Sequence, residues 1–212
     1  MLTGGLFFFW ATKSIAFNLT NRYLKQESVA VYDRHGKIID IKPNARGHYA
    51  LYMRNIPSRF AKLLLQKEDR YFYAHPGVNP LSIARAGFHY AFSGKQQGSS
   101  TLTQQLVKIL LEHEGSRTVS RKLKEALYAL AIELHASKEQ ILTMYLNSAY
   151  FGNQSQGIKE AARFYFGVEP EDLREGETLA LINALKNPSK THPRAPQRPQ
   201  RRSLSAFEIN DL

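Results

Sequence analysis

Hydrophobic residues recur at helical spacing through most of the chain after residue 57. The first such run predicts a helix that begins near Pro57 and ends at Glu68. Capping-box spacing predicts two more helices, starting at Thr101 and Ser137. The same periodicity predicts further helices over residues 79–94, 123–134, 158–167 and 173–185.

The apolar stripe of each helix predicts the face that it buries. In the helix that starts at Thr101, the side chains of Gln104, Gln105 and Lys108 fall largely off this stripe. In the long helix that follows, Glu125 also lies off the stripe. The residues of that helix expected in the core are Leu123, Leu127, Leu130, Ala131 and Leu134.

Strand signals are confined to two β-prone runs over residues 29–41, which flank a turn at Gly36 and predict a hairpin. The predicted fold is therefore mainly α, of the α+β class, with a short N-terminal β-hairpin. After Pro188 the periodicity ends, and Pro and Arg become frequent, as is typical of a disordered tail. We divide the chain into an N-terminal segment, a domain and a tail, over residues 1–28, 29–190 and 191–212.

The N-terminal segment contains an aromatic cluster over residues 7–10. A membrane span needs roughly 20 apolar residues, and this run is shorter and is interrupted by Lys13. We expect the segment to lie at a membrane surface, or to be the end of an anchor that starts earlier. A signal peptide is disfavoured because no basic region precedes the apolar run. A buried N-terminal strand or helix is the alternative interpretation.

The chain is basic, with 29 Lys and Arg against 18 Asp and Glu and a formal net charge of +11. This balance favours a polyanionic partner, such as nucleic acid, anionic lipid or a phosphate-bearing substrate. A nucleic-acid binder is disfavoured because the basic residues between 98 and 125 are interspersed with polar and acidic ones. The absence of cysteine excludes disulfides, thiolate nucleophiles and cysteine metal sites.

The first candidate for chemistry is the acid pair Glu68-Asp69, which precedes an aromatic stretch and His75. Glu68 falls where the predicted helix ends, and the carbonyl end of a helix disfavours negative charge. A carboxylate there gains proton affinity, as a general base requires. The alternative is an ordinary solvated turn that His75 fixes by hydrogen bonding.

The second candidate is Glu125, which lies near a group of cations. A pyrophosphate leaving group departs without protonation, but it needs cations to hold its developing charge. One carboxylate then suffices as the base that deprotonates a sugar hydroxyl, whereas a glycosidase needs a second to protonate its leaving group. Glu125 could instead be a helix-surface acid paired with a neighbouring cation. The cations are Lys108, Arg117, Arg121 and Lys122.

Five ordered stretches carry a family resemblance: 68–77 (EDRYFYAHPG), 98–108 (GSSTLTQQLVK), 121–125 (RKLKE), 141–147 (ILTMYLN) and 157–167 (GIKEAARFYFG). They resemble the motifs of the peptidoglycan glycosyltransferases, the family 51 domain of monofunctional transglycosylases and class A penicillin-binding proteins. The resemblance runs from about Val31 to about Pro193.

The resemblance implies a lysozyme-like helical domain that polymerises lipid II into β-1,4-linked glycan and releases undecaprenyl pyrophosphate. Glu68 would be the general base, Asp69 would support it, and Glu125 would organise the donor pyrophosphate, with Mg²⁺ or Mn²⁺ as an optional metal at Glu125. No organic cofactor and no nucleic acid are expected. The implied substrate-binding residues are Arg70, Phe72, Ser100, Thr101, Gln104, Gln105, Lys108, Arg117, Arg121 and Lys122.

The resemblance also implies a place at the bacterial cytoplasmic membrane, with the catalytic domain on its periplasmic or extracellular face. Expected partners are lipid II, the growing lipid-linked glycan, the membrane and other cell-wall synthesis proteins. No transpeptidase motif is present. We therefore expect either a monofunctional enzyme or part of a longer one.

Departures from the family pattern occur at Ser99, at 153–156 and at Lys186. None of them touches Glu68 or Glu125. A lysozyme-like muramidase that hydrolyses glycan, and a catalytically weak scaffold of the same fold, remain as alternatives. Phe72 and the other aromatic residues of the motifs also suit core packing.

Overall fold

A computed structural model describes residues 2–36, 38–80, 100–112, 118–188, 191 and 193. The chain forms two compact units, each made of two segments. Most of the helix predicted over 79–94, the loop that follows it, Arg117 and nearly all of the predicted tail lie outside the described residues. Unit 1 consists of Met1–Leu24 and Ser58–Tyr145, and unit 2 of Lys25–Pro57 and Leu146–Leu212.

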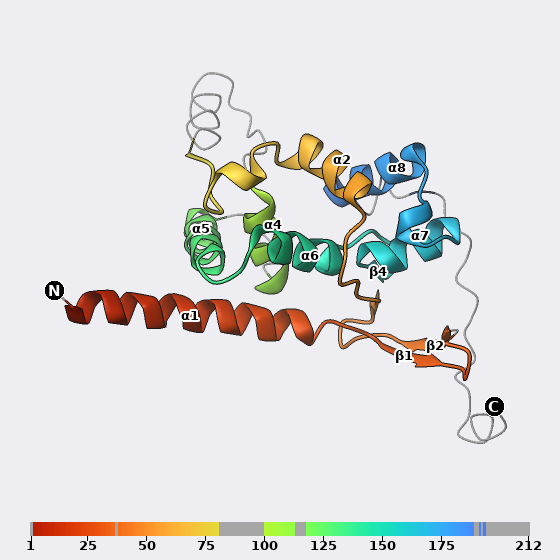
Figure 1. Ribbon diagram of the computed structural model, residues 1–212, viewed down its shortest axis with the longest axis horizontal. Helices are drawn as coiled ribbons and strands as arrows, with labels where there is room; N and C mark the ends of the chain where they lie inside the picture. The colour runs from red at the N-terminus through yellow and green to blue at the C-terminus, as the bar shows by residue number, and fades with distance from the viewer. Residues whose placement is uncertain are drawn as a thin grey trace. The chain divides into compact units, whose positions relative to one another are not determined.

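Unit 1 is helical in its described part (Figure 1). Its long N-terminal helix, α1, packs against α5 and α4, and α4 also packs against α5. The final turn of α6 belongs to unit 2. The elements are α1 (Leu2–Leu24), α2 (Ser58–Glu68), the 3-10 helix η1 (Phe72–Ala74), α4 (Leu102–Leu110), α5 (Val119–Glu133) and α6 (Lys138–Ser148).

Two helix starts in unit 1 are fixed by the predicted capping boxes. At α4, the Thr101 side chain accepts the Gln104 N–H, and the Gln104 side chain accepts the Thr101 N–H. Before α6, Ser137 and Gln140 make the same reciprocal pair, at 3.2 and 2.8 Å. Each box satisfies two backbone donors that the first turn of a helix leaves unpaired. Both predictions are confirmed.

The N-terminal segment forms a helix that buries only one of its faces. Ala16 and Leu19 are buried, and Thr12 is buried with its hydroxyl bonded to backbone oxygens of α1 and to His135 at 3.0 Å. The N-terminal half of α1 exposes the side chains of Leu6, Phe7, Phe8, Phe9 and Trp10. α1 thus joins the helical unit through one stripe and presents apolar side chains elsewhere.

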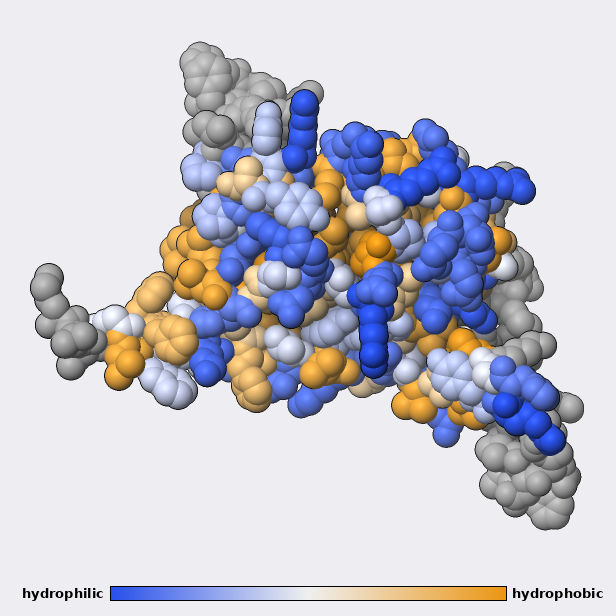
Figure 2. Space-filling view, viewed as in Figure 1, coloured by the Kyte–Doolittle hydropathy of each residue, from blue (hydrophilic) through white to orange (hydrophobic). Residues whose placement is uncertain are grey.

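The predicted buried stripe of α5 is wrong except at Ala131. Leu123, Leu127 and Leu134 are 61%, 55% and 60% exposed, and Leu130 is 38% exposed. The buried face of α5 instead consists of Glu125, Ala129, Ala131 and Ile132. Figure 2 shows apolar side chains, in orange, over α5 and along the N-terminal half of α1. Periodicity located an apolar face correctly but did not reveal that small residues and Glu125 make the protein contact.

Unit 2 contains the predicted hairpin, in which β1 (Val29–Tyr32) pairs antiparallel with β2 (Ile38–Lys42). A second, parallel pair was not predicted: β3 (Tyr49–Ala50) lies beside β4 (Ser155–Gln156). The described remainder is α7 (Ile158–Phe166), the 3-10 helix η2 (Pro170–Asp172) and α8 (Glu175–Lys186).

Asn147 connects the two segments of unit 2, and Gly157 lies close against its backbone. The Asn147 side chain accepts the Met53 N–H at 3.0 Å and donates to the Met53 carbonyl at 2.8 Å. Gly157 has φ +81°, and a Cβ there would lie 2.9 Å from the Asn147 carbonyl oxygen. A side chain is therefore excluded by both conformation and space. The described chain is mainly helical with a short N-terminal hairpin, which confirms the predicted fold class and agrees with a lysozyme-like domain.

Candidate active site

Glu68 is the last residue of α2, as the sequence predicts. The helical hydrogen bonding continues for one residue, because the Asp69 N–H donates to the Leu65 carbonyl at 3.0 Å. The Glu68 side chain is half-buried, and its Oε1 is shielded from solvent. The end of α2 therefore presents a carboxylate that is partly shielded from water.

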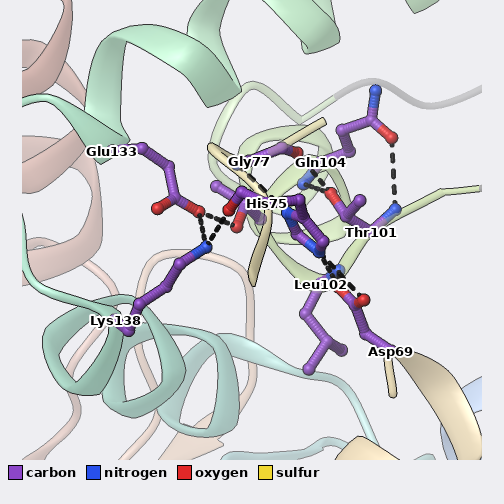
Figure 3. Close-up of polar contacts among 9 residues, drawn as sticks. Asp69, His75, Gly77, Thr101, Leu102, Gln104, Glu133 and Lys138 are labelled. Atoms are coloured by element: carbon purple, nitrogen blue, oxygen red, sulfur yellow. Dashed lines mark hydrogen bonds and ion pairs between the residues drawn. The ribbon is translucent and has the colours of Figure 1, made fainter. Parts of the chain in front are cut away.

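Asp69 is held by two neighbours that fix the backbone immediately after Glu68 (Figure 3). His75 Nε2 lies 2.9 and 3.1 Å from the two carboxylate oxygens of Asp69. The Gly77 N–H donates to His75 Nδ1, so Nε2 is the nitrogen that carries the proton toward Asp69. The Leu102 N–H, at the start of α4, donates to Asp69 Oδ2 at 2.9 Å. Asp69 thereby connects the end of α2 to the start of α4.

Thr101 and Gln104, two predicted substrate-binding residues, are occupied by the cap of α4. Both are buried, and the Thr101 hydroxyl also donates to the Gly77 carbonyl at 2.5 Å. The expectation that Gln104 lies off the buried face is wrong, since it is only 2% exposed. Its side-chain oxygen folds back to the Thr101 N–H, which places the amide inside the cap. Gln105, the next residue, is half-buried and retains accessible surface.

Ser100, Lys122 and Glu125 are brought together as the sequence predicts for a donor site. Lys122 Nζ donates to Ser100 Oγ at 2.7 Å and to Glu125 Oε2 at 3.0 Å. Glu125 is buried, whereas the Lys122 side chain is 45% exposed. Of the other predicted cations, Arg121 is half-buried and Lys108 is exposed. A partly exposed cation beside a buried carboxylate suits the binding of an anionic ligand.

Phe72 and Arg70, two predicted substrate-binding residues, differ in their exposure to solvent. Phe72 has no exposed surface and lies in the core, under the Lys138 ammonium, which is 4.5 Å from its ring centroid. This placement matches core packing rather than substrate contact. Arg70 is exposed, and its guanidinium lies 6.0 Å from the Tyr71 ring centroid.

Three residues of the site region were not predicted from the sequence: Thr103, Glu133 and Lys138. Lys138 Nζ donates to Glu133 at 2.7 Å and to the His75 carbonyl at 2.6 Å, and the Thr103 hydroxyl donates to Glu133 at 2.6 Å (Figure 3). These bonds join α4, α5 and α6 to the loop that follows Glu68. The only sequence signal was an acid five residues before a lysine across a helix break, which is too common to single out.

The sequence predicts core packing for Tyr145, an aromatic residue of the stretch 141–147. Its side chain is buried, and its phenol donates to Gln105 Oε1 at 3.0 Å. Burial, and to a lesser extent the charge of Glu68, hold the pKa of the Tyr145 phenol well above its usual range. The phenol is therefore a neutral hydrogen-bond donor near the candidate base.

The described residues of the site do not by themselves make a metal centre. Within the described ranges, no three His, Asp or Glu side chains gather as ligands would. Glu125, the predicted ligand, directs one carboxylate oxygen to Lys122. A hard divalent cation requires several oxygen ligands. The donor set present here does not fit a resident metal, so we derive no step through one.

Comparison with known proteins decides the family. A model of the family described as transglycosylase matches residues 35–208. The chain belongs to this family. The match covers all five stretches that carry the sequence resemblance, and the predicted family is confirmed.

Curated relatives carry the same domain within longer chains. Penicillin-binding protein 1C of Escherichia coli is 40% identical over 152 residues, 71% of this chain and 20% of that protein. Penicillin-binding protein 1A of Rickettsia prowazekii is 35% identical over 177 residues, 81% of this chain and 22% of that protein. Penicillin-binding protein 2a of Streptococcus pneumoniae is 34% identical over 189 residues, 89% of this chain and 25% of that protein. The transglycosylase chain spans a fifth to a quarter of the length of these relatives.

Proposed function

We propose that this chain is a peptidoglycan glycosyltransferase that polymerises lipid II into β-1,4-linked glycan and releases undecaprenyl pyrophosphate. The observation that carries the proposal is the division of labour between two carboxylates of unit 1. Glu68 stands half-buried at a helix end, beside the fixed Asp69. Glu125 is instead paired with Lys122, which also bonds Ser100. This difference supports Glu68 as the base and Glu125 as the acid that organises a cation.

In the proposed reaction Glu68 removes the proton from the 4-hydroxyl of the acceptor sugar. The hydroxyl oxygen attacks the anomeric carbon of the donor, and the bond from that carbon to the pyrophosphate oxygen breaks with inversion. The electron pair leaves with the pyrophosphate. Lys122 and Arg121 hold the developing negative charge, and the Ser100 hydroxyl orients Lys122. The acceptor proton ends on Glu68 and passes to solvent.

The proposed function implies a place at the bacterial cytoplasmic membrane, with the site on its outer face, and the apolar surface of unit 1 supports contact with a membrane. Leu6 to Trp10 of α1 and the exposed leucines of α5 are too many for a purely aqueous surface. Lys13 lies 5.4 Å from the Trp10 ring centroid, an arrangement suited to the boundary between headgroups and acyl chains. A lipid-linked substrate would be met at this boundary, and other cell-wall synthesis proteins would act there too.

No helix of the described chain is both long enough and apolar enough to cross a membrane.

The test is polymerisation of labelled lipid II in detergent by wild type, Glu68→Gln and Glu139→Gln. Gln keeps the size of Glu but cannot accept the proton, so Glu68→Gln should lose about a hundredfold or more in rate. Glu139 is an exposed acid of α6 and serves as the matched control. Full activity of Glu68→Gln would overturn its role as the base.

The same assay separates transfer from the two alternatives. A muramidase would shorten preformed glycan and make no polymer from lipid II. A scaffold would bind a lipid pyrophosphate without turnover in wild type. The transferase proposal requires polymer from wild type and from Glu139→Gln.

A further inference from the structure

The contact between Tyr145 and Gln105 joins two motifs that lie 40 residues apart in the sequence. Tyr145 belongs to α6 and is 2% exposed, while Gln105 belongs to α4 and is half-buried. The phenol oxygen lies 3.0 Å from Gln105 Oε1. The buried Tyr145 thus contacts Gln105, whose side chain is partly exposed at the candidate site.

The direction of this hydrogen bond fixes the orientation of the Gln105 amide. Burial and the charge of Glu68 keep the Tyr145 phenol protonated, so it has one proton to donate. An amide accepts through its oxygen alone, and its nitrogen only donates. The Gln105 oxygen is therefore turned to Tyr145, and the amide nitrogen is turned away from it, with two protons to donate.

Comparison with the neighbouring Gln104 shows why Gln105 is the glutamine that can donate to a ligand. Gln104 is buried, and its oxygen is used by the Thr101 N–H in the cap of α4. Gln105 keeps accessible surface, and within the described part of the chain its amide nitrogen has no hydrogen-bond partner. An oriented amide with free donor protons fits an oxygen acceptor on a ligand.

We propose that Tyr145 is a positioning residue, which holds the Gln105 oxygen so that the Gln105 amide nitrogen donates to an oxygen of the bound lipid-linked sugar. The inference rests on the proposed function, since it names a contact to the same substrate. Without the phenol, the amide is free to turn its oxygen toward the substrate. The Gln105 oxygen and the substrate oxygen would then face each other without a proton between them. This arrangement weakens substrate binding and stabilises the transition state less.

The test compares Tyr145→Phe with Tyr165→Phe. Tyr165 is also buried, and its phenol donates to the Phe151 carbonyl at 2.9 Å in unit 2. Both variants keep the ring. Tyr145→Phe loses the bond to Gln105, whereas Tyr165→Phe loses the bond to the Phe151 carbonyl and the one accepted from Asn153 at 3.4 Å, so Tyr165→Phe should lose at least as much stability. Only Tyr145→Phe should lower kcat/KM for lipid II, by about tenfold, the equivalent of one hydrogen bond.

A double-mutant cycle with Gln105→Ala decides whether the effect passes through Gln105. In that background Tyr145→Phe should have no further effect on kcat/KM. Gln105→Glu keeps an oxygen for Tyr145 but has no proton to donate, so it should lose at least as much as Gln105→Ala. The proposal would be overturned if the fold-losses in kcat/KM of Tyr145→Phe and Gln105→Ala multiplied in the double variant. Full activity of Gln105→Glu would overturn it as well.

Binding of lipid II, measured by fluorescence with the same variants, keeps the inference separate from the proposed function. Tyr145→Phe should weaken this binding where Tyr165→Phe does not, whether or not turnover follows. Wild type that binds lipid II but makes no polymer would count against the proposed function alone. Equal binding by both phenylalanine variants and wild type, together with equal turnover where turnover occurs, would overturn the role of Tyr145.

Discussion

The buried ion pair between Lys138 and Glu133 gives the sharpest stability prediction. The two side chains are 17% and 7% exposed, and their charged atoms lie 2.7 Å apart. Lys138 also donates to the His75 carbonyl, and Glu133 also accepts from Thr103. The substitution Lys138→Met removes the cation and one backbone contact. It leaves the Glu133 carboxylate buried, with the Thr103 hydroxyl as its remaining hydrogen-bond donor among the described residues.

The expected cost follows from burial rather than from distance. Removing one partner of a buried pair costs about 3–5 kcal/mol, because the other charge stays in a poorly solvated site. The pair Arg163–Glu169 is as short, 2.6 Å, but its side chains are 38% and 45% exposed. Exposed pairs contribute about 0–1 kcal/mol, so Arg163→Met is the matched control.

Urea unfolding of both variants checks this reasoning. Lys138→Met should lower the free energy of unfolding by several times the change in Arg163→Met. The double variant Lys138→Met/Glu133→Leu, which removes both charges, should recover most of the loss. Equal small changes in Lys138→Met and Arg163→Met would refute the argument that burial makes this pair important.

Three further predictions concern the backbone, the apolar surface and metals. Gly77→Ala should destabilise the protein by about 3 kcal/mol in thermal unfolding, because φ is +86° and a Cβ would lie 2.8 Å from the Ala129 carbonyl oxygen. Its control is Gly36→Ala, which should cost only about 1 kcal/mol because Gly36 has φ +79° but lies in open space. Leu127→Glu should weaken binding to anionic liposomes with a stability change within about 0.5 kcal/mol, whereas the same charge added by Asn183→Glu on α8 should leave binding near wild type. Mg²⁺ should not raise the melting temperature of the protein alone, and a rise without a lipid pyrophosphate present would contradict the donor-set argument.

Local signals carried most of what the sequence predicted well. The end of α2 at Glu68 and the caps at Thr101 and Ser137 depend on residues within a few positions of one another. Such signals are complete in the sequence because the hydrogen bonds join near neighbours. The meeting of Lys122 with Glu125 is local in the same way, at a spacing of one helical turn.

The failures have tertiary causes. The leucine stripe of α5 looked like a core face, yet α5 packs through small residues and Glu125, and periodicity does not say what covers an apolar face. The apolar stripe predicts an exposed Gln104 because periodicity does not include the hydrogen bond that the Gln104 side chain accepts from the Thr101 N–H. The Tyr145 bond to Gln105 spans 40 residues, and a single sequence gives no sign of such pairings.

Mass balance in a reaction of wild type with lipid II tests the central claim most directly. The account predicts one undecaprenyl pyrophosphate released for each β-1,4 linkage formed, with preformed glycan left intact. Shortening of preformed glycan, or turnover of lipid II without linkage formation, would contradict it.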